Sequence, residues 1–226
     1  MCVIAVSKAG KRQPSIAELT RCYNNNSDGA GYMYVRAGGD GKVHIRKGFM
    51  DIGEYIEAVF NEHFTDADAV VYHFRISTQA GVNPEMTHPF PMTGNLKSMG
   101  IPSCKCDMAV AHNGIISLTS SKDEHKYSDT ALFVAGYMST FYRHSRDLYD
   151  DSLLDLVADL AGKTNKFAIM NGDGLIQTVG KFEEHDGVLF SNNSYSTTYK
   201  KYDWSDWTDW YTSPTTYYKN YKNYKK

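Results

Sequence analysis

No leucine, isoleucine, valine or methionine occurs after residue 196, and this limits where the chain can build a hydrophobic core. The segment 197–226 instead holds all three tryptophans, each directly preceded by an aspartate, and seven of the seventeen tyrosines. Because these residues supply no aliphatic side chains, we expect residues 2–196 to form one folded domain. Residues 197–226 are expected to form a low-complexity aromatic tail.

The simplest interpretation of this tail is a solvated, flexible extension. The alternative is an aromatic and basic docking segment, for a partner protein or for a nucleic acid whose bases would stack on the rings. The interleaved aspartates argue against nucleic acid, and so does the net charge of −2 for the whole chain.

The rest of the composition is that of an ordinary globular protein, with 42% hydrophobic and 22% charged residues. No apolar run reaches the roughly 18 residues that a membrane-spanning helix needs. The five apolar residues that follow Met1 are too few for the core of a signal peptide. We therefore expect a cytoplasmic protein without a membrane partner, whose four cysteines stay reduced.

Apolar periodicity and turn residues predict a mixed α+β domain, with strands near both ends and helices between them. The expected strands span residues 2–7, 32–36, 43–46, 69–74, 108–111, 167–170, 175–178 and 188–191. The expected helices span residues 14–23, 52–63, 129–142 and 152–161.

Cys2 is a candidate nucleophile because it directly follows Met1. Removal of Met1 would leave a residue that carries both a thiol and a free α-amino group. Their unperturbed pKa values, roughly 8.5 and roughly 8, let a proton pass between them at little cost. An N-terminal amine is an established base for a neighbouring nucleophile. A buried structural cysteine is the alternative interpretation.

Five short motifs follow Cys2. In order they are Asp28-Gly29-Ala30-Gly31, His73-Phe74-Arg75-Ile76-Ser77-Thr78, His88-Pro89-Phe90, His112-Asn113-Gly114 and Ser128-Asp129-Thr130. From Cys2 to about Tyr195 this ordered set resembles the class II glutamine amidotransferases. Their glutaminase domains are N-terminal-nucleophile (Ntn) hydrolases that begin with a catalytic cysteine.

The resemblance implies a four-layer αββα Ntn-hydrolase sandwich. It implies that the Cys2 thiolate attacks the side-chain amide of glutamine, and that the Asn113 side chain and the Gly114 backbone N–H stabilise the resulting oxyanion. The substrate-binding residues that it implies are Arg75, Thr78, His88 and Asp129. No cofactor or metal is implied.

The implied residues also suit their roles chemically. The planar guanidinium of Arg75 can grip an α-carboxylate, and the carboxylate of Asp129 can receive an α-ammonium. Simpler explanations exist for each: a salt bridge for Arg75, helix capping by Ser128 and Asp129, and a type I′ hairpin turn for Asn113-Gly114.

A metal site built from His73, His88 and His112 with the pair Cys104 and Cys106 is a further alternative. Two cysteines separated by one residue, without a second pair at zinc-site spacing, are a weak signal. We therefore interpret Cys104 and Cys106 as loop thiols.

The leading hypothesis is a glutaminase that releases glutamate and ammonia for a separate acceptor synthase, because a tail of about 30 residues is too short to fold into such a synthase. One alternative is a self-contained amidohydrolase acting on a γ-glutamyl amide, which the spelling Thr87-His88-Pro89-Phe90 favours. Another is a non-catalytic binding domain. Departures from the family pattern, such as Ile76 and Met86, leave the exact substrate open.

Overall fold

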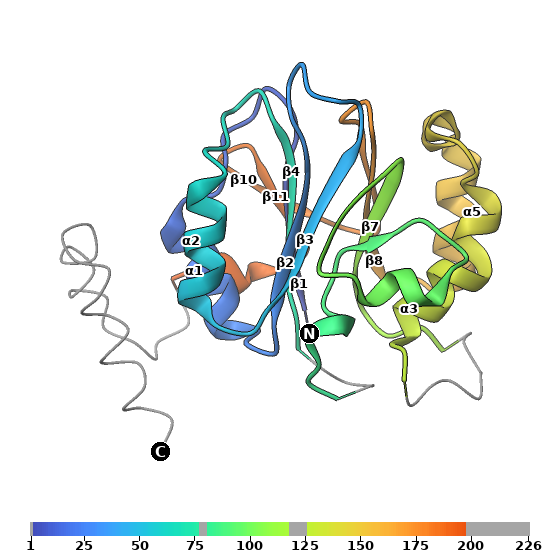
Figure 1. Cartoon of the computed structure of the whole chain (residues 1–226), viewed down its shortest axis with the longest axis horizontal. Helices are drawn as coiled ribbons and strands as arrows, with labels where there is room; N and C mark the ends of the chain where they lie inside the picture. Colours follow the sequence, from blue (N-terminus) through green and yellow to red (C-terminus); the bar gives the residue numbers. More distant parts are fainter. Residues whose placement is uncertain (1, 77–80, 118–125, 198–226) are drawn as a thin grey trace. The chain divides into compact units, whose positions relative to one another are not determined.

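The computed structural model describes residues 2–76, 81–117 and 126–197 (Figure 1). The chain divides into two units, Met1–Tyr195 and Ser196–Lys226, and the first is described here. Thr78 and residues 198–226 lie outside the described residues, so the expectations for Thr78 and for the tail stay predictions.

The first unit is a mixed α/β structure built on two antiparallel sheets. The larger sheet has the strand order β10-β11-β1-β4-β2-β3-β6, and the smaller has the order β5-β7-β8-β9. The strands of the larger sheet are β1 (Val3–Ser7), β2 (Ala30–Val35), β3 (Val43–Phe49), β4 (Ala69–Phe74), β6 (Ser103–Cys106), β10 (Glu183–His185) and β11 (Val188–Phe190). Those of the smaller sheet are β5 (Phe90–Pro91), β7 (Met108–Asn113), β8 (Lys166–Asn171) and β9 (Ile176–Val179).

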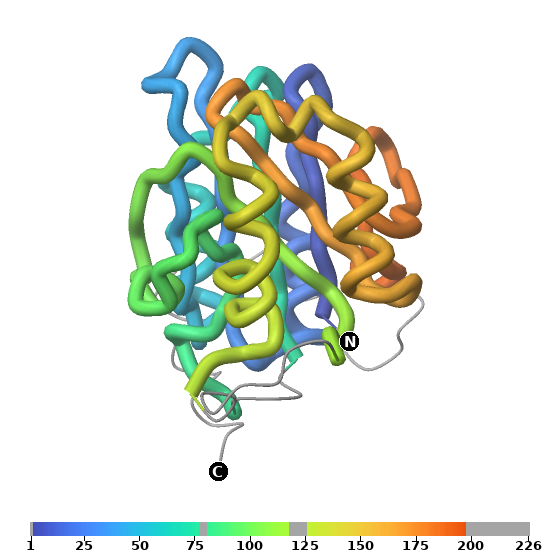
Figure 2. Tube along the Cα trace, turned by 90° about the vertical axis from the view of Figure 1, so that its right-hand side faces the viewer, coloured from blue at the N-terminus to red at the C-terminus, as the bar shows by residue number. Residues whose placement is uncertain are grey.

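Helices cover the outer side of each sheet (Figure 1). Helices α1 (Ile16–Asn25) and α2 (Ile52–Asn61) lie against the larger sheet. The smaller sheet carries α3 (Asp129–Phe133), the π-helical turn η3 (Val134–Met138), α4 (Ser139–Phe141) and α5 (Asp151–Ala161), which face the viewer in Figure 2. Short 3-10 turns complete the unit: η1 (Pro84–Met86), η2 (Leu96–Gly100), η4 (Ser145–Tyr149) and η5 (Asn193–Tyr195).

Side-chain caps decide where the first two helices begin. Ser15 and Glu18 form a capping box in which each side chain accepts a hydrogen bond from the other residue's backbone N–H. Helix α1 therefore begins at Ile16, two residues after the expected start. Asp51 accepts hydrogen bonds from the backbone N–H groups of Gly53 and Glu54, and α2 begins at Ile52 as expected.

The expected strands all occur, with ends that differ by a few residues, but the sequence interpretation missed β5, β6 and β10. The interpretation of Cys104 and Cys106 as loop thiols is wrong, because both lie on β6, where Cys104 is opposite Ile45 of β3. Their side chains pack against the core between the sheets, while Ser103 and Lys105 are exposed. Only two of four residues in this edge strand face the core, and neither is strongly hydrophobic, so its pattern was too short to detect.

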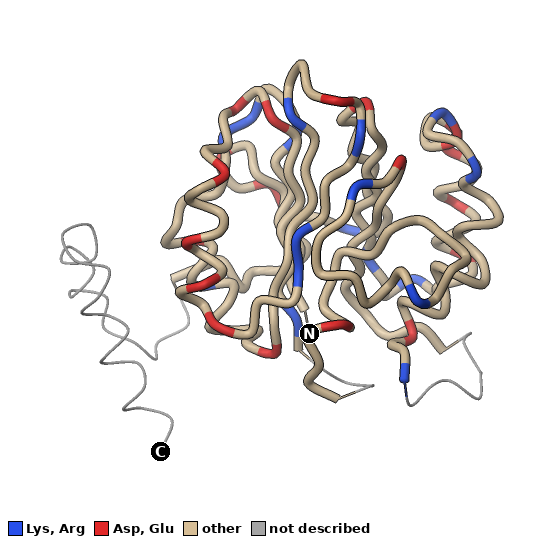
Figure 3. The backbone as a smooth tube through the Cα atoms, in the orientation of Figure 1, with Lys and Arg blue, Asp and Glu red and all other residues tan. Residues whose placement is uncertain are grey.

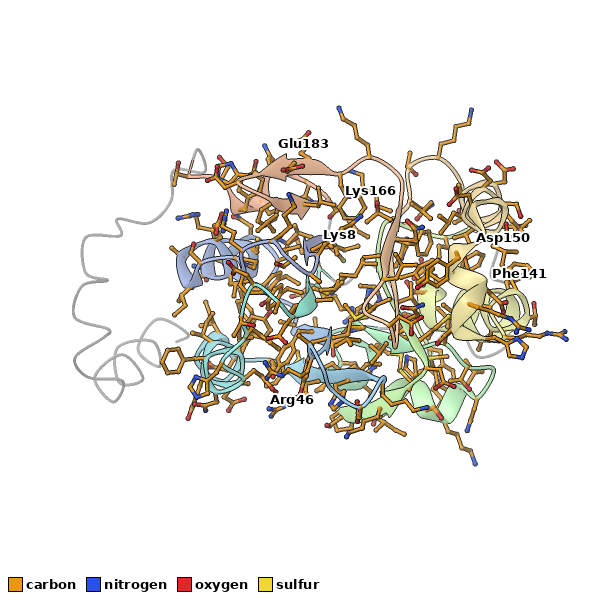
Figure 4. The ribbon with its side chains drawn as sticks, turned by 90° about the horizontal axis from the view of Figure 1, so that it is seen from above. Lys8, Arg46, Phe141, Asp150, Lys166 and Glu183 are labelled. Carbon is orange, nitrogen blue, oxygen red and sulfur yellow. The ribbon has the colours of Figure 1, made fainter. Side chains whose placement is uncertain are left out.

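Strands β7 and β8 are buried on both faces, which explains their continuous apolar sequences. Ala109 and Ala111 of β7 meet the larger sheet in a core that includes Ile4 and Val6 of β1. Val110, between them, faces the opposite way into the core formed with the helices. Seen from above, side chains fill the space between the two sheets (Figure 4).

Acidic and basic residues are intermixed along the backbone of this unit in the view of Figure 3. Within residues 2–76, 81–117 and 126–197, no helix combines the length and the apolar character needed to span a membrane. Two pockets among the described residues lie away from Cys2, Arg75 and Asn113; one, of about 360 Å³, lies between α1 and α2.

Candidate active site

Cys2 directly precedes β1, an interior strand of the larger sheet between β4 and β11. Its Sγ lies 3.4 Å from the backbone nitrogen of Ile76, which donates a hydrogen bond to it, and 3.5 Å from the Ile76 carbonyl oxygen. The side-chain amide of Asn192 donates to the Cys2 carbonyl oxygen at 2.8 Å. Cys2 is therefore held at one end of the sheet by the Ile76 backbone on one side of its strand and by the Asn192 side chain on the other.

Burial raises the pKa of the Cys2 thiol above its ordinary value. The hydrogen bond from Ile76 and the positive charge of Arg75 both act in the opposite direction and favour the thiolate. A thiol in this environment is mostly protonated at neutral pH, so it needs a nearby base to become a nucleophile.

Arg75 lies beside Cys2 because Val3 of β1 pairs with Phe74 of β4. Its backbone N–H donates to the Gly29 carbonyl at 2.8 Å, and its guanidinium Nη1 donates to the Gly81 carbonyl at 2.9 Å. Burial lowers the pKa of this guanidinium, while Cys2 in its thiolate form and the carboxylates of Asp28 and Asp129 raise it. A buried cation close to the thiol is what the proposed grip on a substrate carboxylate requires.

The glycines of the motif Asp28-Gly29-Ala30-Gly31 let another loop approach this end of the sheet. A Cβ atom on Gly31 would lie 2.2 Å from the His88 carbonyl oxygen, and one on Gly29 would lie 2.6 Å from the Thr87 side chain. Gly29 also has a φ of 115°, which a residue with a side chain rarely adopts. The motif therefore brings the His88 loop against β2 next to Arg75.

Asn113 is the last residue of β7, and Gly114 leaves the strand with a φ of 153°. The type I′ hairpin turn considered for this pair is wrong. Such a turn requires positive φ values, and Asn113 does not have one. A hairpin turn would also pair β7 with the segment that follows it directly, but β7 pairs with β5 and β8. The Asn113 amide nitrogen donates to Ser191 Oγ at 2.9 Å, whereas its Oδ1 is buried and has no hydrogen-bond partner in the described part of the chain.

Gly114 is packed so tightly that no side chain fits. A Cβ atom there would lie 2.1 Å from the side-chain oxygen of Asn165, the residue that precedes β8. The same Asn165 oxygen is 2.7 Å from His112 Nε2. Asn165 therefore supports the strand end and also requires glycine at position 114.

Three buried histidines support the end of β7. The backbone carbonyl of His112 lies 2.9 Å from His73 Nε2 and 3.0 Å from His88 Nδ1. Burial lowers the pKa of His73 to about 3, that of His88 well below its ordinary value, and that of His112 as well. All three are therefore neutral at physiological pH and act as hydrogen-bonding groups.

A metal site was the alternative interpretation of these three histidines. Among the described residues, no group of three His, Cys, Asp or Glu side chains could hold a metal ion. His88, expected to bind substrate, contacts the His112 backbone and the rings of His73 and Phe90. Its substrate-binding role stays a prediction.

Ser128 takes the helix-capping role considered for this motif, whereas the substrate-binding role of Asp129 stays a prediction. The Ser128 hydroxyl caps α3 by accepting a hydrogen bond from Ala131 N at 3.2 Å. Asp129 accepts hydrogen bonds from Ile116 N and Thr130 N, both at 2.7 Å. Ile116 is two residues beyond Gly114, so this carboxylate ties the loop after β7 to the start of α3.

The chain after β11 joins the two sheets at this end. Ser191 and Asn192 contact β1 and Cys2 on one side, and Ser191 contacts Asn113 on the other. The sequence interpretation missed Asn165, Lys166, Ser191 and Asn192, because isolated polar residues next to apolar strands form no recognisable motif.

Neither the protein-family models nor the curated proteins searched match this chain. The arrangement of its own residues is therefore what bears on function.

Proposed function

We propose that this protein is an N-terminal-cysteine amidohydrolase of the glutamine amidotransferase type. The observation that carries the proposal is the meeting of Cys2, Arg75 and Asn113 at one end of two adjacent sheets. They come from parts of the chain more than 35 residues apart in sequence, yet Cys2 and Arg75 are neighbours across β1 and β4, and Ser191 links β1 to Asn113.

The chemistry begins once Met1 has been removed and the α-amino group of Cys2 is free. The amine takes the thiol proton, and the thiolate sulfur forms a bond to the side-chain carbonyl carbon of glutamine. The carbonyl π electrons move to the oxygen, and Asn113 and Gly114 donate hydrogen bonds to the resulting oxyanion. When the C–N bond breaks, the amine returns the proton to the leaving nitrogen, and ammonia departs from a thioester.

Water then completes the cycle. The α-amino group removes a proton from a water molecule whose oxygen attacks the thioester carbon. The C–S bond breaks, the sulfur recovers the proton, and glutamate is released. Arg75 would hold the α-carboxylate and Asp129 the α-ammonium throughout, and the ammonia would pass to a separate acceptor enzyme in the cytoplasm.

The finer fold assignment belongs to the same proposal. Helices on the outer side of each of two stacked antiparallel sheets support an αββα sandwich of the Ntn-hydrolase kind. The position of Cys2 at the start of an interior strand also supports it, because the new N-terminus would then lie in the site itself.

A γ-glutamyl amide with an apolar substituent is the second candidate substrate. Ile115, which directly follows Gly114, is 51% exposed although it is a large hydrophobic residue. An apolar group on the leaving nitrogen could cover this side chain, which ammonia cannot do.

The test is an amide-hydrolysis assay on purified protein whose intact mass establishes that Met1 is absent. Glutamine and a set of γ-glutamyl amides are compared by measuring glutamate and the released amine. Labelling with a glutamine-mimicking thiol reagent, followed by peptide mapping, locates the reactive cysteine.

The matched variants are Cys2→Ala and Cys104→Ser. We expect Cys2→Ala to abolish hydrolysis and labelling without unfolding the protein, and Cys104→Ser, on the edge strand, to keep both. Hydrolysis by Cys2→Ala, or no hydrolysis of any amide by the wild-type protein, would sink the proposal; the second result would favour a binding domain.

A further inference from the structure

Ser191 occupies a junction between the nucleophile strand and the oxyanion residue. It directly follows β11 and is 1% exposed. Its backbone N–H donates to the Ile4 carbonyl at 2.9 Å, and its Oγ accepts from the Ile4 N–H at 2.9 Å. The same Oγ lies 2.9 Å from the Asn113 amide nitrogen. The Ser191 carbonyl also accepts a hydrogen bond from Lys166 Nζ. In Figure 4, Lys166 lies on the same side of the unit as Glu183.

At this junction the hydrogen-bond donors and acceptors of Ser191 and Asn113 are not fully paired. A serine hydroxyl can accept two hydrogen bonds and donate one. With the Asn113 amide as placed, Ser191 Oγ accepts from both Ile4 and Asn113, and its own proton has no acceptor among the described residues. At the same time Asn113 Oδ1 is buried without a partner within residues 2–76, 81–117 and 126–197. One donor and one acceptor, both buried, are thus left unused a few ångströms apart.

A half-turn of the Asn113 amide about its Cβ–Cγ bond pairs the Ser191 proton with the amide oxygen and leaves only the NH₂ group unpaired. The oxygen and nitrogen of an amide have nearly the same shape, so the hydrogen-bond network decides which orientation holds. After the turn, Ser191 accepts from Ile4 and donates to Asn113 Oδ1. The Asn113 NH₂ group then occupies the unpartnered position, where it is a donor without an acceptor.

We propose that Ser191 is a positioning residue that orients the Asn113 amide, so that its NH₂ group is presented to the oxyanion. This inference rests on the proposed function and adds a residue to it. An asparagine whose oxygen faced the oxyanion would repel the developing negative charge. The orientation of the amide therefore decides whether Asn113 helps or opposes the reaction, and the Ser191 hydroxyl supplies the one proton that selects it.

A double-mutant cycle on the Met1-free protein tests this inference. Loss of one oxyanion donor typically lowers kcat roughly 10²–10³-fold, and we expect this for Asn113→Ala. Ser191→Ala leaves the donor in place but frees its orientation, so we expect a smaller loss in kcat, about 10-fold, with little change in KM. Because Ser191 acts only through Asn113, the double variant should be no slower than Asn113→Ala alone.

Alkylation of Cys2 by iodoacetamide separates this role from a merely structural one. Displacement of iodide creates no oxyanion, so its rate reports the position and reactivity of the thiol alone. We expect Ser191→Ala to react at the wild-type rate. Ser7→Ala is the matched control: Ser7 is also buried, at the far end of β1, and donates to the backbone of Arg12, so its loss should lower thermal stability without changing kcat.

If Ser191→Ala does not fold, Ser191→Cys is put through the same cycle, because a thiol fills a similar volume and is a poor donor. Multiplicative losses in the double variant, or slower alkylation of Cys2, would mean that Ser191 acts on β1 and would overturn the inference. A wild-type protein that hydrolyses no amide would instead overturn the proposed function, so the two failures are distinguishable.

Discussion

Cys2 and the Asn113–Gly114 corner lie at the ends of strands in different sheets, and they are held in different ways. Cys2 is positioned by backbone pairing, since β1 pairs with β4 on one side and β11 on the other. The corner is positioned by buried polar side chains, among them His73, His88 and Asn165. The nucleophile therefore depends on the sheet as a whole, whereas the corner depends on individual hydrogen bonds.

This difference predicts where the site is sensitive to substitution. A ladder of backbone hydrogen bonds is shared by many residues, so a changed side chain on β1 should cost stability without moving Cys2 far. A side-chain network has no such redundancy, because each buried donor or acceptor left without its partner carries the full cost of desolvation. Three substitutions can break or sharpen this contrast.

The largest effect is expected for Gly114→Ala, which adds one methyl group to the corner. The new Cβ would lie 2.1 Å from Asn165 Oδ1, so either Asn165 or the backbone must move. We expect kcat for amide hydrolysis to fall by roughly 10²-fold or more, and the free energy of unfolding by about 1–3 kcal/mol. Enzyme kinetics and urea unfolding measure the two effects.

Two controls belong to this experiment. Gly136→Ala adds the same methyl group where no atom lies within 4 Å and should leave kcat unchanged. Val6→Ala, in the buried part of β1, should lower stability by about 2 kcal/mol without lowering kcat. If Val6→Ala slowed the reaction as much as Gly114→Ala does, the contrast between ladder and corner would be wrong.

A smaller effect is expected for Arg75→Lys, on the side of the nucleophile. Lysine keeps the charge but loses the planar pair of donors, a loss worth about 1.5–3 kcal/mol of substrate binding. KM should therefore rise roughly 10- to 100-fold while kcat changes little. Arg46→Lys, at a half-exposed ion pair with Glu62, is the control and should leave KM unchanged. A fall in kcat at constant KM would show that Arg75 acts on the thiol instead.

The third effect is a pH dependence of stability that originates in the corner. Burial lowers the pKa of His73 to about 3, so below about pH 6.5 the unfolded chain binds a proton that the folded chain does not. The free energy of unfolding should therefore fall as the pH drops from about 6.5 towards 3, by up to about 1.4 kcal/mol per pH unit from this residue.

His73→Gln keeps a donor for the His112 carbonyl and removes the titrating ring. Urea midpoints at about pH 7.5, 6 and 5 should fall less steeply for this variant than for the wild-type protein. Parallel curves would mean that His73 is not the source of the acid sensitivity, and that the neutral-histidine description of the corner fails.

Much of the secondary structure could be predicted from local patterns. The capping residues Ser128 and Asp51, the hairpin around residues 38–41 and the apolar strands are recognisable without tertiary contacts. Strand β6 was not recognisable in this way, because its two core-facing residues are cysteines and only the pairing with β3 makes it a strand. The order of the short motifs also selected Cys2, Arg75, Asn113 and Asp129 as candidates.

What sequence alone determined was the set of reactive groups and the elements that carry them, since both follow from residue type and local periodicity. Tertiary structure decided how those groups are held. Ser191, Asn165 and His73 matter because they meet Asn113 or His112 across gaps of 39 to 78 residues in the chain, and no local pattern encodes such a meeting. Hydrogen bonds depend on distance and direction, and only the pairing of strands and the packing of one sheet on the other set these.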